Sequence, residues 1–191
     1  MTPFRLPGDD VVFQSLNALA IPWLDAVMVF ASSREFAVLA SVMLVAWLWG
    51  SLRRHALRPV IQASVSLGIV DWLGHEVLKP WVGRTRPCFE LPKGSFRCLV
   101  EIGNSGSMPS LHAANAFAVA MAVSLAWPYA GRVLFPIAAL VAISRVFVGV
   151  HWPSDVVAGA LYGCLVALLV HSAWTLAQSR RVRKMAAPVQ E

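Results

Sequence analysis

The chain has 191 residues, of which 58% are hydrophobic and 14% charged, with a net charge of +6. Soluble domains carry about 25% charged residues, so the composition excludes an ordinary soluble domain and indicates a membrane protein. The basic residues flank apolar runs and form no stripe with interleaved aromatic side chains, so they indicate membrane topology and no nucleic-acid partner. The length fits one domain over residues 1–191.

Residues 1–34 form an N-terminal segment that is apolar on average but interrupted by polar residues. Gln14, Asn17 and Asp25 lie within it, and Pro22 divides it. A charge near the bilayer centre costs roughly 2.5 to 3.5 kcal/mol. We therefore expect two short interfacial helices split at Pro22, with a membrane span here as the alternative.

Five later apolar runs predict membrane-spanning helices. About 20 apolar residues cross a hydrocarbon core ~30 Å thick. The fold class expected is therefore all-α, an integral membrane bundle of five transmembrane helices, or six if the N-terminal segment also spans. The predicted spans are residues 35–52, 59–79, 109–128, 132–149 and 153–178.

Basic residues assign the two sides of this bundle. In a five-span arrangement the following all fall on one side: Arg53, Arg54, Arg58, Arg132 and the basic tail, residues 179–191. The positive-inside rule makes that side cytoplasmic. The long loop of residues 80–108 and the turn at His151 then face outward, which predicts an outward-facing site.

Three polar islands lie at the ends of apolar runs, and the first covers residues 79–87. It holds Lys79, Arg84 and Arg86, punctuated by proline and glycine. Arginine presents a planar fork that matches phosphate oxygens, and lysine supplies a compact charge. The island predicts a phosphate cradle, with a positive anchor at the membrane surface as the alternative.

The second island opens the predicted helix 109–128. Ser110, Leu111 and His112 occupy its first turn, where unpaired N–H groups and the helix dipole favour an anion. His112 adds a group that donates or accepts a proton near neutral pH. The alternative is an ordinary helix start beside an interfacial histidine.

The third island contains Arg145, His151 and Asp155. A carboxylate bonded to one nitrogen of an imidazole fixes its tautomer and leaves the other nitrogen free to attack. The alternative is a capping aspartate beside an interfacial histidine, which does not require Arg145. Two histidines and an aspartate also suit zinc or iron, but the surrounding cations favour an anion, so we expect no metal and no cofactor.

Together the islands resemble the signature of the type 2 phosphatidic-acid phosphatases, the lipid phosphate phosphatase superfamily that includes the vanadium haloperoxidases. That signature is Lys, six residues, Arg-Pro; then Pro-Ser-Gly-His; then Ser-Arg, five residues, His, three residues, Asp. The chain matches it over residues 79–87, 109–112 and 144–155. One position departs, because Leu111 replaces the family glycine.

The resemblance implies roles for the matching residues. His151 would be the nucleophile that forms a phosphohistidine, Asp155 would orient it, and His112 would protonate the leaving oxygen and later activate water. The phosphate ligands implied are Lys79, Arg86, Ser110, the Leu111 N–H and Arg145. Arg84 lies outside the signature and is expected to support the site or contact a headgroup.

The implied activity is removal of a terminal phosphate from a lipid phosphate or diphosphate in the membrane. The short chain resembles the compact bacterial members, which implies a bacterial inner-membrane protein whose site faces the periplasm. Undecaprenyl diphosphate is favoured, and phosphatidylglycerophosphate and the 1-phosphate of lipid A are the alternatives. A haloperoxidase and a non-catalytic lipid-binding or transport protein are more distant alternatives. The oligomeric state stays open.

Two further groups of residues attract notice. Asp71, His75 and Lys79 follow at four-residue intervals, which places them on one helical face. We expect Asp71 and His75 to support Lys79 or a proton path, with a structural polar cluster as the alternative. Cys88 and Cys98 share the outer loop, where an oxidising periplasm permits a disulfide or leaves two free thiols.

Overall fold

A computed structural model describes residues 3–103 and 105–186, the last three by their backbone only. The described part of the chain is helical with connecting loops, which confirms the all-α prediction. The helices are α1 (Asp9–Asn17), α2 (Pro22–Ala31), α3 (Arg34–Leu52), the 3-10 turn η1 (Arg53–Ala56), α4 (Leu57–Leu73), the π-helical turn η2 (Gly74–Leu78), α5 (Lys79–Val82), α6 (Pro87–Glu90), α7 (Leu111–Ala126), the 3-10 turn η3 (Pro128–Ala130), α8 (Gly131–Phe147) and α9 (Pro153–Ala186).

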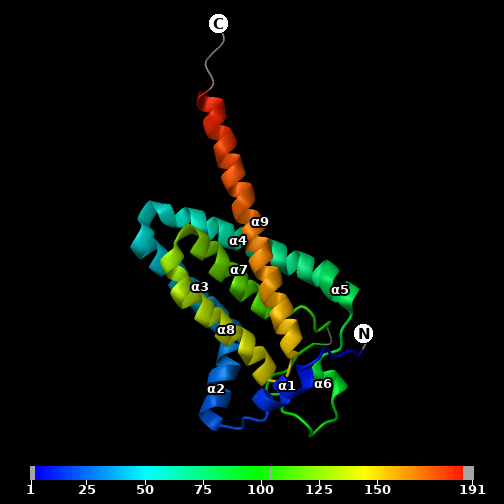
Figure 1. The fold of residues 1–191 in the computed structure, drawn as a ribbon. Coiled ribbons are helices and arrows are strands. Elements are labelled where there is room, and N and C mark those ends of the chain that lie inside the picture. The colour runs from blue at the N-terminus through cyan, green and yellow to red at the C-terminus, as the bar shows by residue number, and fades with distance from the viewer. Residues whose placement is uncertain (1–2, 104, 187–191) are drawn as a thin grey trace.

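The prediction of five firm spans was wrong. Three helical segments are long and apolar enough to cross a membrane, or four if α1 and α2 form one bent span. The first two predicted spans are arms of one helical stretch, Arg34–Val82, that turns at η1 (Figure 1). The predicted span 109–128 is α7, which has only 16 residues and falls short of a full crossing.

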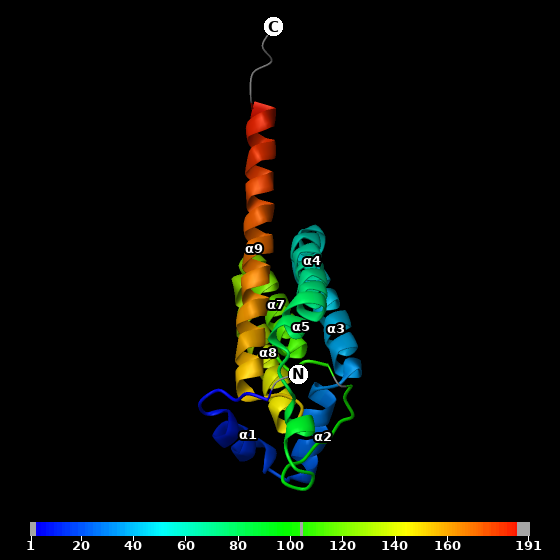
Figure 2. The ribbon, with the colours of Figure 1, turned by 90° about the vertical axis from the view of Figure 1, so that its right-hand side faces the viewer.

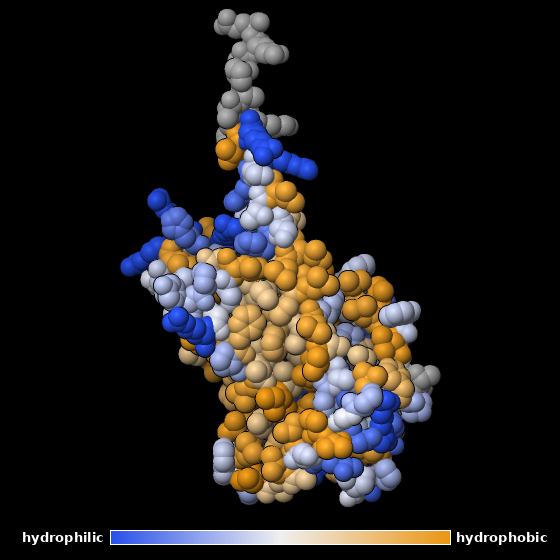
Figure 3. Space-filling view, viewed as in Figure 1, coloured by the Kyte–Doolittle hydropathy of each residue, from blue (hydrophilic) through white to orange (hydrophobic). Residues whose placement is uncertain are grey.

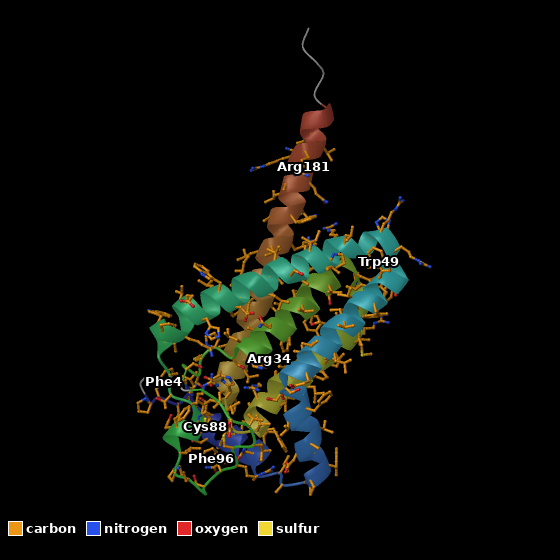
Figure 4. All side chains as sticks on the ribbon, turned by 180° about the vertical axis from the view of Figure 1, so that it is seen from behind. Phe4, Arg34, Trp49, Cys88, Phe96 and Arg181 are labelled. Carbon is orange, nitrogen blue, oxygen red and sulfur yellow. The ribbon has the colours of Figure 1, made fainter. Side chains whose placement is uncertain are left out.

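The short helices lie at one end of the molecule. Helices α1, α2 and α6 lie together there, and α9 runs along the bundle and projects beyond the opposite end (Figures 1 and 2). Labelled side chains follow this division, since Cys88 and Phe96 lie at the first end whereas Trp49 and Arg181 lie toward the second (Figure 4).

Helix α7 is the centre of the bundle and packs against α4, α8 and α9. Its buried positions are mostly alanine. On α9, Gly159 and Gly163 face it so closely that a Cβ on Gly163 would lie 2.0 Å from the Ala114 carbonyl oxygen. Small residues four apart allow such close approach of membrane helices. The contact places the start of α7 beside the start of α9.

The N-terminal segment forms two helices divided at Pro22, as expected, with a bend of 119° between them. It packs under the turn of residues 148–152. The Phe13 ring lies 5.1 Å from the Trp152 ring, and Asn17 donates through Nδ2 to the Phe147 carbonyl oxygen. The segment is therefore a structural support of that turn, a role that its polar interruptions did not suggest.

Hydropathy divides the surface in the same way. Apolar residues cover much of the middle of the face shown in Figure 3, and hydrophilic residues gather around the α3–α4 turn and the base of the projecting part of α9, with a second group at the lower right. Together with the apolar helices, this apolar surface is that of an integral membrane protein.

Candidate active site

Hydrogen bonds between backbone groups bring the three polar islands to one place. The Ser110 N–H donates to the Asp155 carbonyl oxygen at 3.0 Å, and the Ser107 N–H donates to the Arg84 carbonyl oxygen at 2.8 Å. The first bond joins the start of α7 to the start of α9, and the second ties the long loop to the first island. Residues far apart in sequence thus meet at one end of the bundle.

His151 lies at the centre and is buried, with 2% of its surface exposed. Arg86 Nη1 lies 2.9 Å from Nε2, and Asp155 Oδ2 lies 3.3 Å from Nδ1. A guanidinium has no lone pair to accept a hydrogen bond, so Arg86 donates and Nε2 is the unprotonated nitrogen. Nδ1 then carries the proton and donates a hydrogen bond to Asp155. This is the tautomer of a nucleophilic histidine.

The surroundings keep that ring neutral. Burial lowers the pKa of His151 well below its ordinary value, and the positive charges of Arg86, Arg145 and Lys79 lower it further. A neutral imidazole retains the lone pair that an attacking nitrogen needs.

Behind Nδ1 lies a chain of buried charges. Asp155 accepts hydrogen bonds from the Ser107 hydroxyl and the Trp152 N–H, and its Oδ1 lies 2.6 Å from Arg84. Arg84 is fully buried and also pairs with Asp9 of α1 at 2.5 Å. A guanidinium between two carboxylates fixes the orientation of both, so Asp9 reaches the His151 ring through Arg84 and Asp155.

Asp9 also holds the start of α9. Its Oδ1 accepts from the Ser154 N–H at 2.9 Å, and its Oδ2 accepts from the Ser154 hydroxyl at 2.8 Å. The expectation that Arg84 supports the site fits this geometry. Sequence reasoning missed Asp9, Ser107 and Ser154, and the one available signal was an aspartate at a helix start.

Two of the proposed phosphate ligands, Arg145 and Ser110, have hydrogen-bond donors that lack partners in the described part of the chain. Arg145 donates from Nη1 to the backbone and hydroxyl oxygens of Ser32, which anchors it to the end of α2. Its Nε and the Ser110 hydroxyl are buried and find no partner among the described residues. An anion with several acceptor oxygens would satisfy both.

Arg86 is anchored in the same way. Its Nε donates to the Ser105 carbonyl oxygen at 2.9 Å, and its Nη2 donates to the Ser105 hydroxyl at 3.0 Å. Lys79 and His75 line a neighbouring cavity of about 300 Å³ that includes Ser105 and Gly106. This cavity provides room for a ligand beside the buried cations.

Leu111 keeps its side chain out of this space. It packs with Val70, Ala114 and Val166, in a contact where a Cβ on Gly74 would lie 2.4 Å from Leu111 Cδ2. The side chain is thus accommodated between α4, α7 and α9, and the backbone N–H at the helix start stays in place.

His112 and Asp71 occupy more open positions. His112 is exposed at the first turn of α7, yet near enough to His151 to contribute to the lowering of the pKa of that ring. Asp71 accepts a 2.8 Å hydrogen bond from Asn115 of α7. The π-helical turn η2 separates Asp71 from Lys79 and disturbs the expected common face. This geometry favours the structural alternative for Asp71, whereas His75 does lie beside Lys79.

Cys88 and Cys98 are free thiols in the structure. Burial, together with the neighbouring Cys98, raises the pKa of the Cys88 thiol to about 11. The predicted disulfide stays a prediction. Among the described residues, no group of three or more histidine, cysteine, aspartate or glutamate side chains is arranged to hold a metal ion.

Several known proteins are similar to this chain in sequence or in fold. Residues 59–178 match the PAP2 superfamily. The chain is 31% identical over 169 residues to "Putative undecaprenyl-diphosphatase YbjG" of Escherichia coli (strain K12), covering 85% of this chain and 81% of that protein. It is 27% identical over 156 residues to "Undecaprenyl-diphosphatase BcrC" of Bacillus subtilis (strain 168), covering 76% and 72%.

Among solved structures, the fold resembles that of Aquifex aeolicus LpxE, with a TM-score of 0.67 and 23% identity over 87% of this chain and 96% of that one. The chain therefore belongs to the PAP2 superfamily, and it is a membrane lipid phosphate phosphatase of that family.

Proposed function

We propose that the protein removes the terminal phosphate of undecaprenyl diphosphate through a phosphohistidine on His151, without a metal ion. The observation that carries the mechanism is the pair of contacts on the His151 ring, with Asp155 at Nδ1 and Arg86 at Nε2. The preference for this lipid rests on the names of the relatives from Escherichia coli and Bacillus subtilis.

In the first step Nε2 of His151 attacks the terminal phosphorus, a P–N bond forms, and the bond from phosphorus to the bridging oxygen breaks. Arg86 moves its hydrogen bond from Nε2 to a phosphate oxygen as the ring attacks. Arg145, Ser110, Lys79 and the Leu111 N–H hold the remaining oxygens, where negative charge develops.

His112 then completes the proton balance. It gives a proton to the leaving lipid phosphate and afterwards accepts one from water, which attacks the phosphohistidine and releases inorganic phosphate. His112 lies in the first turn of α7, close enough to affect the His151 ring, which suits a group that passes protons to the substrate and from water.

The site faces the periplasm in this proposal. The α3–α4 turn, which contains η1, and Arg181 of α9 lie at the end opposite the active site (Figures 1 and 4), and the positive-inside rule makes that end cytoplasmic. Arg5 lies at the catalytic end, where it pairs with Glu90. An Arg5→Cys variant in a background without other cysteines should react with an impermeant maleimide added outside intact cells, and protection there would contradict this orientation.

The activity is tested with detergent-solubilised protein and a panel of undecaprenyl diphosphate, phosphatidylglycerophosphate and lipid A 1-phosphate, with and without EDTA. Phosphate release should be fastest from undecaprenyl diphosphate, survive EDTA and disappear in His151→Ala. Loss of release with EDTA would contradict the metal-free mechanism, and faster release from another lipid would contradict the substrate.

A further inference from the structure

A second polar cavity lies at the end of the molecule opposite the active site. It has a volume of about 610 Å³ and lies between the α3–α4 turn, the end of α7 and the C-terminal half of α9. In Figure 3 this end carries the strongly hydrophilic residues around the α3–α4 turn and the base of the projecting part of α9. The proposed phosphatase mechanism uses none of its residues.

The polar lining of this cavity consists of positively charged or hydrogen-bond-donating groups. Arg54, His55 and Arg58 come from the α3–α4 turn and the first turn of α4, and Trp174 and Gln178 come from α9. None of the lining residues is aspartate or glutamate. Within the described residues, no salt bridge involves either of these arginines.

Two of these donors are buried without a partner. Arg58 Nε and Trp174 Nε1 find no hydrogen-bond acceptor in the described part of the chain. A buried donor left unpaired costs about 1 to 3 kcal/mol. Two of them in the lining of one cavity indicate that an acceptor-rich group belongs there.

The rim of the cavity is apolar. Leu57 and Ile61 line it and remain 54% and 41% exposed, and Trp174 is of the type enriched at the membrane–water boundary. A ligand that fits both parts carries an anionic phosphate group for the arginines and a hydrocarbon part for the rim.

We propose that this cavity binds the phosphate group of an anionic membrane phospholipid as a site separate from the catalytic one. Arg54 and Arg58 hold the phosphate oxygens, the Trp174 indole N–H donates to the headgroup, and the acyl chains leave over Leu57 and Ile61. The bound lipid joins the α3–α4 turn to α9, which otherwise projects past the bundle (Figure 2).

The test measures retained lipid by native mass spectrometry of the full chain in a neutral detergent with phosphatidylglycerol, a phosphodiester with no terminal phosphate to hydrolyse. Wild type should retain one phosphatidylglycerol, and Arg54→Gln and Arg58→Gln should each weaken retention about tenfold, as expected for one charge-assisted hydrogen bond. Arg53→Gln is the matched control, because Arg53 neighbours Arg54 in η1 but does not line the cavity. Arg54 is exposed, so its variant keeps the test valid if Arg58→Gln folds poorly.

Two further experiments identify the ligand. Phosphatidylcholine should be retained no better by wild type than by Arg54→Gln. Thermal unfolding with inorganic phosphate distinguishes the source of the anion: an increase in midpoint that Arg54→Gln loses would support a free phosphate as occupant, whereas an increase confined to phosphatidylglycerol supports the lipid. Equal phosphatidylglycerol retention by wild type, Arg54→Gln and Arg58→Gln would overturn the proposal.

Discussion

The two sides of the His151 ring are built differently. On the Nδ1 side, Asp155, Arg84 and Asp9 are buried and bonded to one another in series. On the Nε2 side lies Arg86, and two other proposed phosphate ligands, Arg145 and Ser110, keep buried donor atoms without partners in the described residues. All the buried charges on the first side have partners within the protein, whereas these donors on the second side lack partners until a ligand binds. Different residues therefore orient the nucleophile and bind the phosphate.

The largest effect is expected from the ring itself. His151→Gln removes the attacking nitrogen, and activity should fall on the order of 10⁴-fold or more, as for other enzymes that lose a nucleophile. Phosphate release from the preferred lipid measures this, with circular dichroism as the control for folding. Residual activity within tenfold of wild type would contradict the assignment.

The next largest effect concerns the ligand side. Arg145→Lys keeps a positive charge but removes the Nε donor and the planar fork, so kcat should fall about 10² to 10³-fold. Its thermal stability should change less than its activity. An unchanged kcat would show that the unpartnered Nε does not face the phosphate.

Asp9→Asn removes the charge of the carboxylate that is farthest from His151 in the series Asp155, Arg84 and Asp9. Removing one partner of a buried pair leaves Arg84 undercompensated and should lower the free energy of unfolding by about 3 to 5 kcal/mol. Because Arg84 is then held less firmly against Asp155, kcat should fall about tenfold with little change in KM.

Asp10→Asn is the matched control for Asp9→Asn. It removes a carboxylate one residue away that pairs with Arg5 at the surface, and exposed pairs contribute about 0 to 1 kcal/mol. Equal effects of the two substitutions on kcat would contradict a positioning role for Asp9.

The pH dependence of stability gives a smaller effect. Burial and neighbouring cations lower the pKa of His151 in the folded state, so below its ordinary value of about 6.5 the unfolded chain binds a proton that the folded chain refuses. Stability must therefore fall as pH drops. Between pH 7.5 and 5.5 the thermal midpoint should fall more in wild type than in His151→Gln, and equal falls would contradict a buried neutral ring.

The smallest effect on turnover is expected at Leu111. Leu111→Ala retains the backbone N–H and removes a side chain that packs against Val70 and Val166. It should lower stability by about 2 kcal/mol and leave kcat within about threefold. A large gain in kcat would show instead that the leucine narrows the phosphate pocket.

The sequence was informative where chemistry is local. The spacing of His151 and Asp155 within one turn, and of Lys79 and Arg86 within one island, predicts residues that the structure does bring together. It was uninformative about Asp9, because its partner Arg84 lies 75 residues away and a buried ion pair across such a separation leaves no periodic signal.

The span count failed for a related reason. Hydropathy does not report where a helix stops, and α7 ends at Ala126 after 16 residues because Trp127, which precedes Pro128, is extended. Other helices enclose α7. Its alanines and the facing Gly159 and Gly163 serve close packing. Apolar content in this segment therefore reflects burial in protein more than contact with lipid.

The most direct test of the central claim is isolation of the phosphoenzyme. His112→Ala is mixed with p-nitrophenyl [³²P]phosphate, whose leaving group needs no acid, and quenched within milliseconds. The account predicts a covalent label that is stable to alkali, labile to acid, located on the peptide containing His151 and missing from the His112→Ala/His151→Gln double variant. Phosphate release by His112→Ala without such a label, or a label on another residue, would contradict it.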